Sequence, residues 1–369
     1  MKITILQGAF LPVPPLRGGA IEKAWQGLGE AFARAGHEVT HISRLCDSLP
    51  KEESIGGVRH IRIAGAEACR SPILLKTREF SYVWRAQKIL PQADILVTHA
   101  FWAPLLLPRE KHGKIYVHVG RYPKGQLRLY KKAARLQVPS QVIARAVSAE
   151  LADTGDRVRC IPYPLPFSLE QDLPFKGRPK RVLYAGRIHP EKGVLELARA
   201  WRKLPLNLQK EWSLRLIGPW REEQGGGGLD FLEKLKSAAG DGMEICDPVF
   251  EEKELIKQYQ EARIFVYPSK ARKGETFGLA VLEAMRCGCV PLVSSLQCFE
   301  DFITHGENGV RVENQEILGK NGLVEALNNL LIDPEIEQLS KRAVITAQRY
   351  ETDLVAAQFL EDFEELKSK

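Results

Sequence analysis

The sequence lacks any long, uninterrupted hydrophobic run. Its most apolar segment, residues 95–107, contains His99 and Pro104 and is too short to span a bilayer. The opening residues MKITIL are also too short an apolar stretch for a signal peptide, because the polar Gln7 and then Gly8 follow at once. We therefore expect a cytoplasmic protein.

Cysteine is scarce and shows no pairing pattern. The chain has 369 residues and seven cysteines, an odd number, and no two of them are spaced as CxxC. This argues against a disulfide framework. Cys287, Cys289 and Cys298 lie close in sequence, but no neighbouring His or Cys pair has zinc-ligand spacing. We expect reduced, mostly buried cysteines and no bound metal.

Motifs of several common enzyme classes are absent too. The loop after the first expected strand contains Gly18 and Gly19 but no GxGxxG, and no acidic residue ends the second strand, which disfavours nicotinamide binding. The chain also lacks the P-loop GxxxxGK[ST] and the GxSxG turn of serine hydrolases. It contains no DxD pair of the kind that carries a metal ion.

Charge is distributed unevenly along the chain. Residues 1–166 hold 25 Lys and Arg against 13 Asp and Glu, a net charge of +12, whereas residues 167–369 hold 28 against 33, a net charge of −5. A basic half indicates an anionic partner, which can be a phosphorylated substrate, a membrane lipid or nucleic acid. Because no helix-turn-helix, zinc finger or RNP-like aromatic pattern accompanies it, we expect no nucleic-acid partner, and a nucleic-acid-binding protein is kept only as an alternative.

Strand-like and helix-like segments alternate through most of the chain, which predicts an α/β fold with parallel sheets. The proline-rich stretch 161–180 lacks periodicity and marks a domain boundary. We expect two doubly wound, Rossmann-like domains with an interdomain cleft, at residues 1–165 and 166–349. A C-terminal helix at about 350–369 is expected to pack back on the first domain.

Four further elements are predicted from local patterns. The first domain should contain a basic helix at 126–136 and a strand at 142–147. The tail from 316 to 368 reads as several helices, and the glycine run 225–228 as a flexible surface loop.

Several loops carry residues suited to an anionic ligand. RGGA places Gly18 and Gly19 before a helix, where backbone N–H groups can approach phosphate. AGRIHPEKG carries Arg187 and Lys192, two cations that can stabilise a departing diphosphate. ETFGLAVLE places two carboxylates eight positions apart, about 12 Å along a helix, so they can contact different parts of one long ligand. His118 ends a strand in YVHVG, a position where a lone histidine is more often a core residue.

The two carboxylates, Glu275 and Glu283, form an E-x7-E motif. It follows AGRIHPEKG and is accompanied by FGL, LEAM and then ENGVRV, in that order. This pattern resembles the family 4 retaining glycosyltransferases of GT-B fold over nearly the whole chain. The resemblance implies transfer from a nucleotide-diphosphate sugar, with retention at the anomeric carbon and without a metal ion or cofactor. Gln297 and Cys298 depart from the family, which usually has a Gly-Gly pair there.

The resemblance also implies roles for individual residues. It suggests that Arg187 and Lys192 hold the diphosphate, that Glu283 binds the ribose hydroxyls and that Glu275 faces the donor sugar. The implied catalytic residues are His118, Glu275, Arg187 and Lys192. The implied donor-binding residues are Gly18, Gly19, Arg187, Lys192, Val249, Phe250, Glu275, Phe277, Gly278, Leu279 and Glu283. The candidates on the acceptor side are His99, Arg121 and Lys124.

We expect transfer of a hexose from a UDP-sugar, with UDP-glucose favoured, to a saccharide or lipid-linked saccharide acceptor in envelope or extracellular polysaccharide synthesis. The basic, partly apolar segments 74–90 and 121–135 fit an anionic membrane surface. A peripheral position on the inner face of the membrane is therefore expected beside the cytoplasmic one. A catalytically silent nucleotide-sugar sensor is the remaining alternative.

Overall fold

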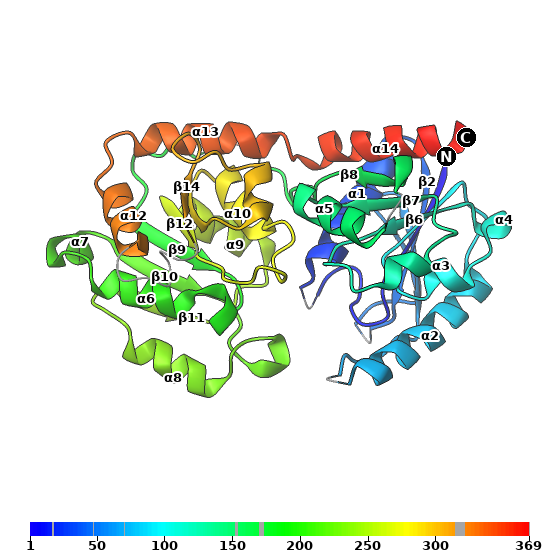
Figure 1. Cartoon of the computed structure of the whole chain (residues 1–369), viewed down its shortest axis with the longest axis horizontal. Coiled ribbons are helices and arrows are strands. Elements are labelled where there is room, and N and C mark those ends of the chain that lie inside the picture. Colours follow the sequence, from blue (N-terminus) through cyan, green and yellow to red (C-terminus); the bar gives the residue numbers. More distant parts are fainter. Residues whose placement is uncertain are drawn as a thin grey trace. The chain divides into compact units, whose positions relative to one another are not determined.

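The chain forms two compact units, each built on its own sheet (Figure 1). Unit 1 comprises Met1–Phe167 and Tyr350–Lys369, and unit 2 comprises Ser168–Arg349. The computed structural model describes residues 1–16, 18–46, 48–69, 71–151, 154–169, 173–313 and 322–368. Within these ranges, no helix is both long and apolar enough to cross a membrane.

Unit 1 contains an eight-stranded sheet in the order β3-β4-β2-β1-β5-β6-β7-β8. All neighbouring strands are parallel except β3 and β4, which form an antiparallel pair. The central strands are short apolar runs buried along almost their whole length, as a parallel sheet covered on both faces requires. The strands are β1 (Lys2–Leu6), β2 (Glu38–Arg44), β3 (Glu52–Ile55), β4 (Val58–Ile63), β5 (Ile95–Thr98), β6 (Lys114–His118), β7 (Arg135–Val138) and β8 (Val158–Cys160).

The helices of unit 1 are α1 (Ala20–Arg34), α2 (Pro72–Ile89), α3 (Ala103–Leu106), α4 (Arg109–His112), α5 (Gln141–Glu150) and α14 (Thr352–Ser368), with 3-10 turns η1 (Gln126–Leu129) and η2 (Gly155–Arg157). Helix α1 forms because its apolar residues recur at three- and four-residue spacing, so that Trp25, Leu28 and Phe32 share one buried face. This face packs in the main core of the unit.

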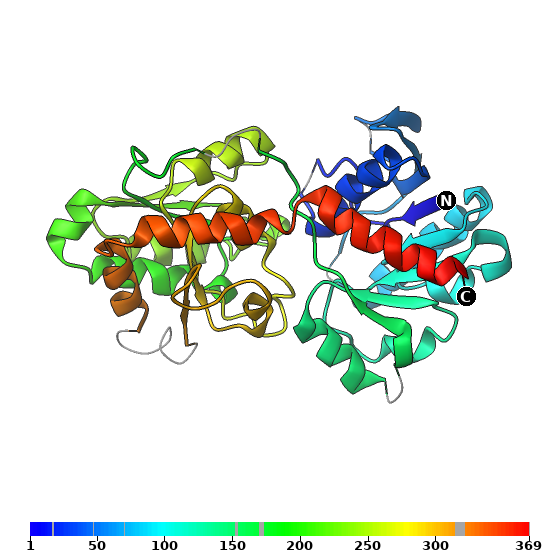
Figure 2. The same ribbon diagram turned by 90° about the horizontal axis from the view of Figure 1, so that it is seen from above.

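Helix α14 completes that core although it comes from the other end of the chain. Phe359 and Phe363 lie among the residues of α1 and the central strands. Asp362 is buried and accepts a hydrogen bond from the Tyr116 hydroxyl at 2.8 Å, and its carboxylate lies 2.6 Å from Arg135. Figure 2 shows this helix, in red, crossing the unit 1 sheet. The helix is therefore joined to unit 1 by both apolar packing and a buried ion pair.

Unit 2 contains a six-stranded, all-parallel sheet in the order β11-β10-β9-β12-β13-β14. Its strands are β9 (Arg181–Ala185), β10 (Ser213–Ile217), β11 (Met243–Cys246), β12 (Ile264–Tyr267), β13 (Val290–Ser294) and β14 (Val310–Val312). Its helices are α6 (Val194–Arg202), α7 (Leu206–Glu211), α8 (Leu229–Ser237), α9 (Glu252–Gln260), α10 (Leu279–Arg286), α12 (Gly322–Leu331) and α13 (Ile336–Gln348), with 3-10 turns η3 (Pro190–Lys192), η4 (Glu222–Gln224) and η5 (Gln297–Asp301). The predicted α/β class with two doubly wound sheets is confirmed.

Two of the predicted elements in unit 1 are wrong. The basic segment expected as a helix at 126–136 forms only the 3-10 turn η1, and its last residues enter strand β7. The segment 142–147 is not a strand but part of helix α5, because Ile143 and Val147 are four residues apart and buried on one face. The short strands β3 and β8 were not expected. Residues 316–321 of the predicted helical tail lie outside the described residues, as does Arg17 of the RGGA segment.

Unit 1 buries two histidine rings against each other. His41 on β2 and His60 on β4 are both fully buried, with ring centroids 5.2 Å apart and stacked. Burial lowers the pKa of His41 well below its usual value and lowers the pKa of His60 to about 4. Among the described residues, neither ring nitrogen of His60 has a hydrogen-bond partner. Both rings are therefore held neutral in the folded unit.

Stability of unit 1 should depend on pH because of this pair. In the unfolded chain both histidines bind protons as pH falls below about 6.5, whereas in the folded unit His60 does so only near pH 4, so stability is lost across that window. We expect His60→Phe to flatten the fall in melting temperature between pH 6.5 and 4. Val58→Ala, a buried change on the same strand without a titrating group, should lower the melting temperature by a similar amount at both pH values. An unchanged pH slope in His60→Phe would contradict this account.

Candidate functional site

The strand order of unit 2 reverses between β9 and β12. The chain continues from β9 to β10 and β11 on one side, then returns to place β12 on the other side of β9. In open parallel sheets the loops at the carboxyl ends of the two strands flanking such a switch point form the usual ligand site. These loops, residues 186–193 and 268–278, carry Arg187, Lys192 and Glu275.

Lys192 and Glu275 form an ion pair across this switch point. The Lys192 Nζ atom lies 2.7 Å from Glu275 Oε2, and both side chains are largely buried, with exposed fractions of 7% and 11%. The Tyr267 ring lies beneath them, 5.4 Å from the Lys192 ammonium, and stacks on Tyr184. Burial, together with the Glu275 charge, raises the pKa of Tyr267, so its phenol stays neutral beside the pair. The structure thus brings together two residues that are 83 positions apart in the chain.

The two loops interlock through their backbones. Gly193 adopts a left-handed conformation, with φ of 70°, and a Cβ atom there would lie 2.0 Å from the Pro268 carbonyl oxygen. The Lys270 N–H donates to the Glu191 carbonyl oxygen at 2.8 Å. A glycine is required at position 193 by both conformation and space. This close approach fixes the distance at which Lys192 meets Glu275.

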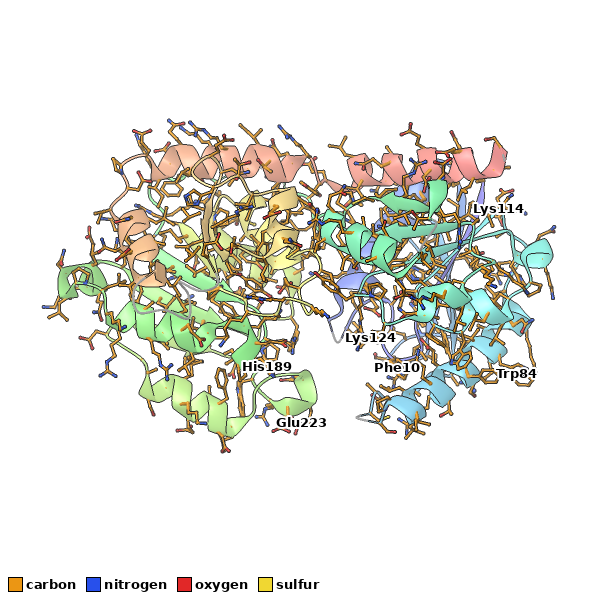
Figure 3. The ribbon with its side chains drawn as sticks, viewed as in Figure 1. Phe10, Trp84, Lys114, Lys124, His189 and Glu223 are labelled. Atoms are coloured by element: carbon orange, nitrogen blue, oxygen red, sulfur yellow. The ribbon has the colours of Figure 1, made fainter. Side chains whose placement is uncertain are left out.

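Arg187 is held in position by two partners. Its Nη1 atom donates to the Gly225 carbonyl oxygen at 2.6 Å, and its Nη2 atom donates to Glu191 Oε1 at 2.5 Å. The side chain is 41% exposed, so the guanidinium keeps access to solvent. His189, labelled in Figure 3, belongs to the same loop, with Nδ1 3.7 Å from the Glu191 carboxylate. Arg187 is therefore held in one orientation, and its charge, like that of Glu275, acts on the Tyr267 phenol.

The glycine run 225–228, which its composition predicts to be a flexible surface loop, makes several backbone hydrogen bonds. The N–H groups of three of these glycines donate to backbone carbonyl oxygens at 2.8–2.9 Å. Gly226 bonds to Arg221, Gly227 to Ile188 and Gly228 to Trp220. A Cβ atom at Gly226 would lie 2.2 Å from the Trp220 backbone. The glycines are needed because the loop folds tightly against its own start and against the loop of Arg187. The carbonyl oxygen of Gly225 in this loop accepts the hydrogen bond from the Arg187 guanidinium.

Helix α10 begins beside Glu275 and carries Glu283. Gly278 is its N-cap in the left-handed conformation, and Leu279 is the first helical residue. The Phe277 ring is buried and lies 5.5 Å from the Phe302 ring, so it anchors the turn rather than facing solvent. The partial positive charge of the helix N-terminus is directed at this turn, where an anion is favoured.

Glu283 lies one turn from the end of α10 and is buried, with 6% of its surface exposed. Its Oε2 atom accepts a hydrogen bond from the Tyr259 hydroxyl of α9 at 2.9 Å. Burial and the Glu283 charge raise the pKa of Tyr259, so the phenol remains a donor. Val249 and Phe250 lie in the loop that leads into α9, and Phe250 is 59% exposed. Cys298, at the departure from the family pattern, is buried in η5.

Unit 1 has an equivalent switch point between β1 and β5. There the Gly8 N–H donates to His99 Nε2 at 3.1 Å, and Glu22 Oε1 lies 4.0 Å from the same nitrogen. Burial lowers the pKa of His99 to about 3 and raises that of Glu22. Gly18 and Gly19 both have positive φ, and Gly19 is the N-cap of α1. The Glu22 carboxylate folds back over Gly19, where a Cβ atom would lie 2.3 Å from Oε2.

His118 is bound on both sides of its ring. Nδ1 lies 2.5 Å from Gln137 Oε1 and Nε2 lies 2.8 Å from the Tyr163 hydroxyl, and the residue is 3% exposed. Burial lowers the pKa of His118 to about 4. This geometry is that of a hydrogen-bonded core histidine, and the catalytic role stays a prediction.

Arg121 and Lys124 lie on the exposed loop after β6 (Lys124 is labelled in Figure 3). Burial raises the pKa of Glu22 and that of Glu79 in α2. The charge of Arg121 acts on both carboxylates and partly lowers their pKa values again. The two carboxylates were not among the residues expected from sequence. Glu22 could have been predicted from the sequence, because it lies three positions after the N-cap Gly19. A glutamate at that position can fold back toward the backbone N–H of the N-cap residue.

Comparison with known proteins identifies the class of unit 2. The model of the family described as "Glycosyl transferases group 1" matches residues 168–349, which is the unit that carries the Lys192–Glu275 pair. A sucrose-phosphate synthase from Thermosynechococcus elongatus has the same fold, with a TM-score of 0.79 at 21% identity, covering 100% of this chain and 99% of that one. The fold and the matched unit define a glycosyltransferase of GT-B fold.

Unit 2 belongs to the group 1 glycosyl transferases, because the family model matches this unit from its first residue to its last. Among curated relatives, the chain is 25% identical over 355 residues to the uncharacterized glycosyltransferase MJ1607 of Methanocaldococcus jannaschii, with 85% of each chain covered. It is 26% identical over 197 residues to the lipopolysaccharide 1,2-N-acetylglucosaminetransferase of Salmonella typhimurium, covering 53% of this chain. That match spans only 50% of the Salmonella protein.

The interlock at Gly193 provides a test of this geometry. Gly193→Ala should lower both the melting temperature and nucleotide affinity, because the methyl group must displace the Pro268 carbonyl. Gly306→Ala is the matched control, since Gly306 also has positive φ, 78°, but nothing lies within 4 Å of its Cβ position. Gly306→Ala should cost only the backbone strain of about 1 kcal/mol. Equal losses in the two variants would show that the loops do not interlock here.

Proposed function

We propose that the protein transfers a hexose from a nucleotide-diphosphate sugar to a saccharide or lipid-linked saccharide, without a metal ion. The observation that carries this proposal is the buried Lys192–Glu275 pair at the switch point, with Arg187 beside it. The name of the Salmonella relative supports the substrate class, because it specifies transfer of N-acetylglucosamine in lipopolysaccharide. We propose a UDP-sugar as the donor, with UDP-glucose as the favoured one, and envelope or extracellular polysaccharide as the product.

The reaction separates charge, and the site contains groups that offset it. As the anomeric bond breaks, positive charge develops on the sugar and negative charge on the leaving diphosphate. Arg187, Lys192 and the N-terminus of α10 supply positive charge for the diphosphate. Such donors stabilise the transition state because they are already oriented and need little rearrangement. In this proposal they replace a metal ion.

Glu275 lies next to Lys192 and is the motif carboxylate assigned to the sugar. Because it is paired with the ammonium at 2.7 Å, its nucleophilicity is reduced, and we assign it to sugar hydroxyls rather than to a covalent intermediate. Retention then arises from attack on the same face as the leaving group, with the acceptor hydroxyl hydrogen-bonded to the departing phosphate. Glu283, with Oε2 on Tyr259, is assigned to the ribose hydroxyls.

The basic unit 1 is proposed to receive the acceptor, with His99, Arg121 and Lys124 on that side. The same charge favours association with an anionic membrane surface, where each cation contributes about 1 kcal/mol. A panel of UDP-, GDP- and ADP-sugars, scored for hydrolysis and transfer, identifies the donor. Absence of turnover with every donor, despite nucleotide binding, would indicate a sensor instead of an enzyme.

The donor site is tested by matched carboxylate variants. Glu283→Gln should weaken nucleotide-sugar binding about ten- to a hundredfold, since a charged acceptor contributes roughly 1.5–3 kcal/mol to such bonds. The amide oxygen introduced by this substitution can still accept a hydrogen bond from the Tyr259 hydroxyl, so the fold should persist. Glu307→Gln, on an exposed turn, should leave affinity unchanged. Calorimetry with the intact chain makes the measurement, and wild-type affinity in Glu283→Gln would overturn the donor assignment.

The cations should act mainly on the rate. Arg187→Ala and Lys192→Ala should lower turnover at saturating donor more than they lower affinity, because the charge they meet grows in the transition state. Chelation of divalent metals with EDTA should leave wild-type turnover nearly intact. An activity that vanishes with EDTA and returns with Mg²⁺ or Mn²⁺ would refute the metal-independent part of the proposal.

A further inference from the structure

Helix α2 leaves most of its apolar side chains outside the core. Only Tyr82, Val83 and Ala86 of its 18 residues are buried. A surface helix of a soluble protein normally turns its apolar stripe inward, so an outward apolar face marks a contact surface. The helix lies at the margin of unit 1 in Figure 1, and Trp84, labelled in Figure 3, belongs to it. The exposed apolar residues are Ile73, Leu74, Phe80, Trp84 and Ile89, with exposed fractions from 40% to 78%.

The same helix forms one wall of a groove of about 490 Å³. This is within the size range of small-molecule sites, and nearly all of the lining surface is apolar. Phe80 and Trp102 meet edge to face, with centroids 5.4 Å apart, and Trp102 Nε1 donates to the Lys76 carbonyl oxygen at 2.8 Å. Trp102 is therefore held against helix α2 where the two line the groove. The lining residues are Pro72, Ile73, Lys76, Thr77, Phe80 and Trp102.

One cation, Lys76, lines this apolar groove. The Lys76 ammonium lies 2.9 Å from the centre of the Phe101 ring, so its charge is placed next to the groove rather than in open solvent. The guanidinium groups of Arg78 and Arg85 donate instead to the carbonyl oxygens of Glu67 and Ala64, and the Lys88 ammonium lies 3.7 Å from the Trp84 ring. An apolar groove with a cation at its rim is complementary to an anionic amphiphile, and the proposed function favours one whose hydrocarbon chain ends in phosphate.

We propose that this groove binds the hydrocarbon chain of a lipid-linked acceptor, with the phosphate nearest the chain at Lys76. The inference rests on the proposed function and narrows its acceptor from saccharides in general to lipid-linked ones. A groove bounded by α2 and Trp102 can take up a single chain, whereas a flat bilayer surface would engage only the outer residues of the helix. The groove would thus hold the anchor of the acceptor while its saccharide extends away from α2.

The test uses farnesyl phosphate as a short, soluble probe, with calorimetry on the full chain. Wild-type protein should bind it saturably, and inorganic phosphate should not compete at equal concentration. Phe80→Ser should weaken binding about tenfold or more, since the probe loses an aromatic contact. Lys76→Gln should weaken farnesyl phosphate binding but leave farnesol binding unchanged. Ile89→Ser is the control, because Ile89 is exposed on the same helix but does not line the groove.

A second arm separates the groove from a membrane contact. If farnesyl phosphate does not bind, while Phe80→Ser and Ile89→Ser reduce flotation with phosphatidylglycerol vesicles equally, the face is a membrane contact and the proposal is overturned. Hydrolysis of the nucleotide sugar without acceptor is measured in parallel and should be unchanged in Phe80→Ser. If wild-type protein neither binds nor hydrolyses any nucleotide sugar but binds the probe through Phe80 and Lys76, the proposed function fails, and the groove is a prenyl-phosphate site without an acceptor role.

Discussion

The buried ion pair between Lys192 and Glu275 is the constraint on which the candidate site depends. Removing two charges from water costs several kcal/mol, and their mutual attraction often does no more than offset that cost. A pair so placed therefore contributes little to stability, and its position between the loops of two adjacent strands favours a role in ligand binding. In the proposed function, the leaving diphosphate would share the Lys192 ammonium and a sugar hydroxyl would donate to the Glu275 carboxylate while the ion pair itself persists.

The surrounding elements support that pair in a consistent way. The glycines at 193 and 226 allow loops to approach more closely than any side chain would permit. The neutral phenol of Tyr267 lies below the pair without adding charge. In unit 1, a second set of polar groups gathers at the corresponding switch point, where His99 meets the Gly8 amide. Each sheet thus presents its polar residues where its strand order reverses, as the geometry of parallel sheets requires.

Much of this could be predicted from the sequence, since alternating apolar segments fix the sheet class and the loop motifs fall at strand ends. Glu275 of the E-x7-E motif lies in the turn before α10, and Glu283 lies within that helix, as their spacing predicts. What could not be predicted depends on packing between distant segments. The glycine run 225–228 packs against its neighbours through carbonyl partners that include Ile188, Trp220 and Arg221. Residues 142–147 have an apolar composition that suits either strand or helix, and burial of one face decides for the helix. Glu22 and Glu79 acquire shifted pKa values from burial that no local pattern reveals.

The contribution of α14 to unit 1 has a consequence for synthesis of the chain on the ribosome. The strands of this unit are complete once residue 160 has been made, but Phe359, Asp362 and Phe363 belong to its core and to the buried ion pair with Arg135. Unit 2 is one continuous segment and has all of its residues before α14 exists. The unit that is second in sequence can therefore reach its final packing first, while the unit begun earlier must wait, incompletely packed, for the last helix to emerge.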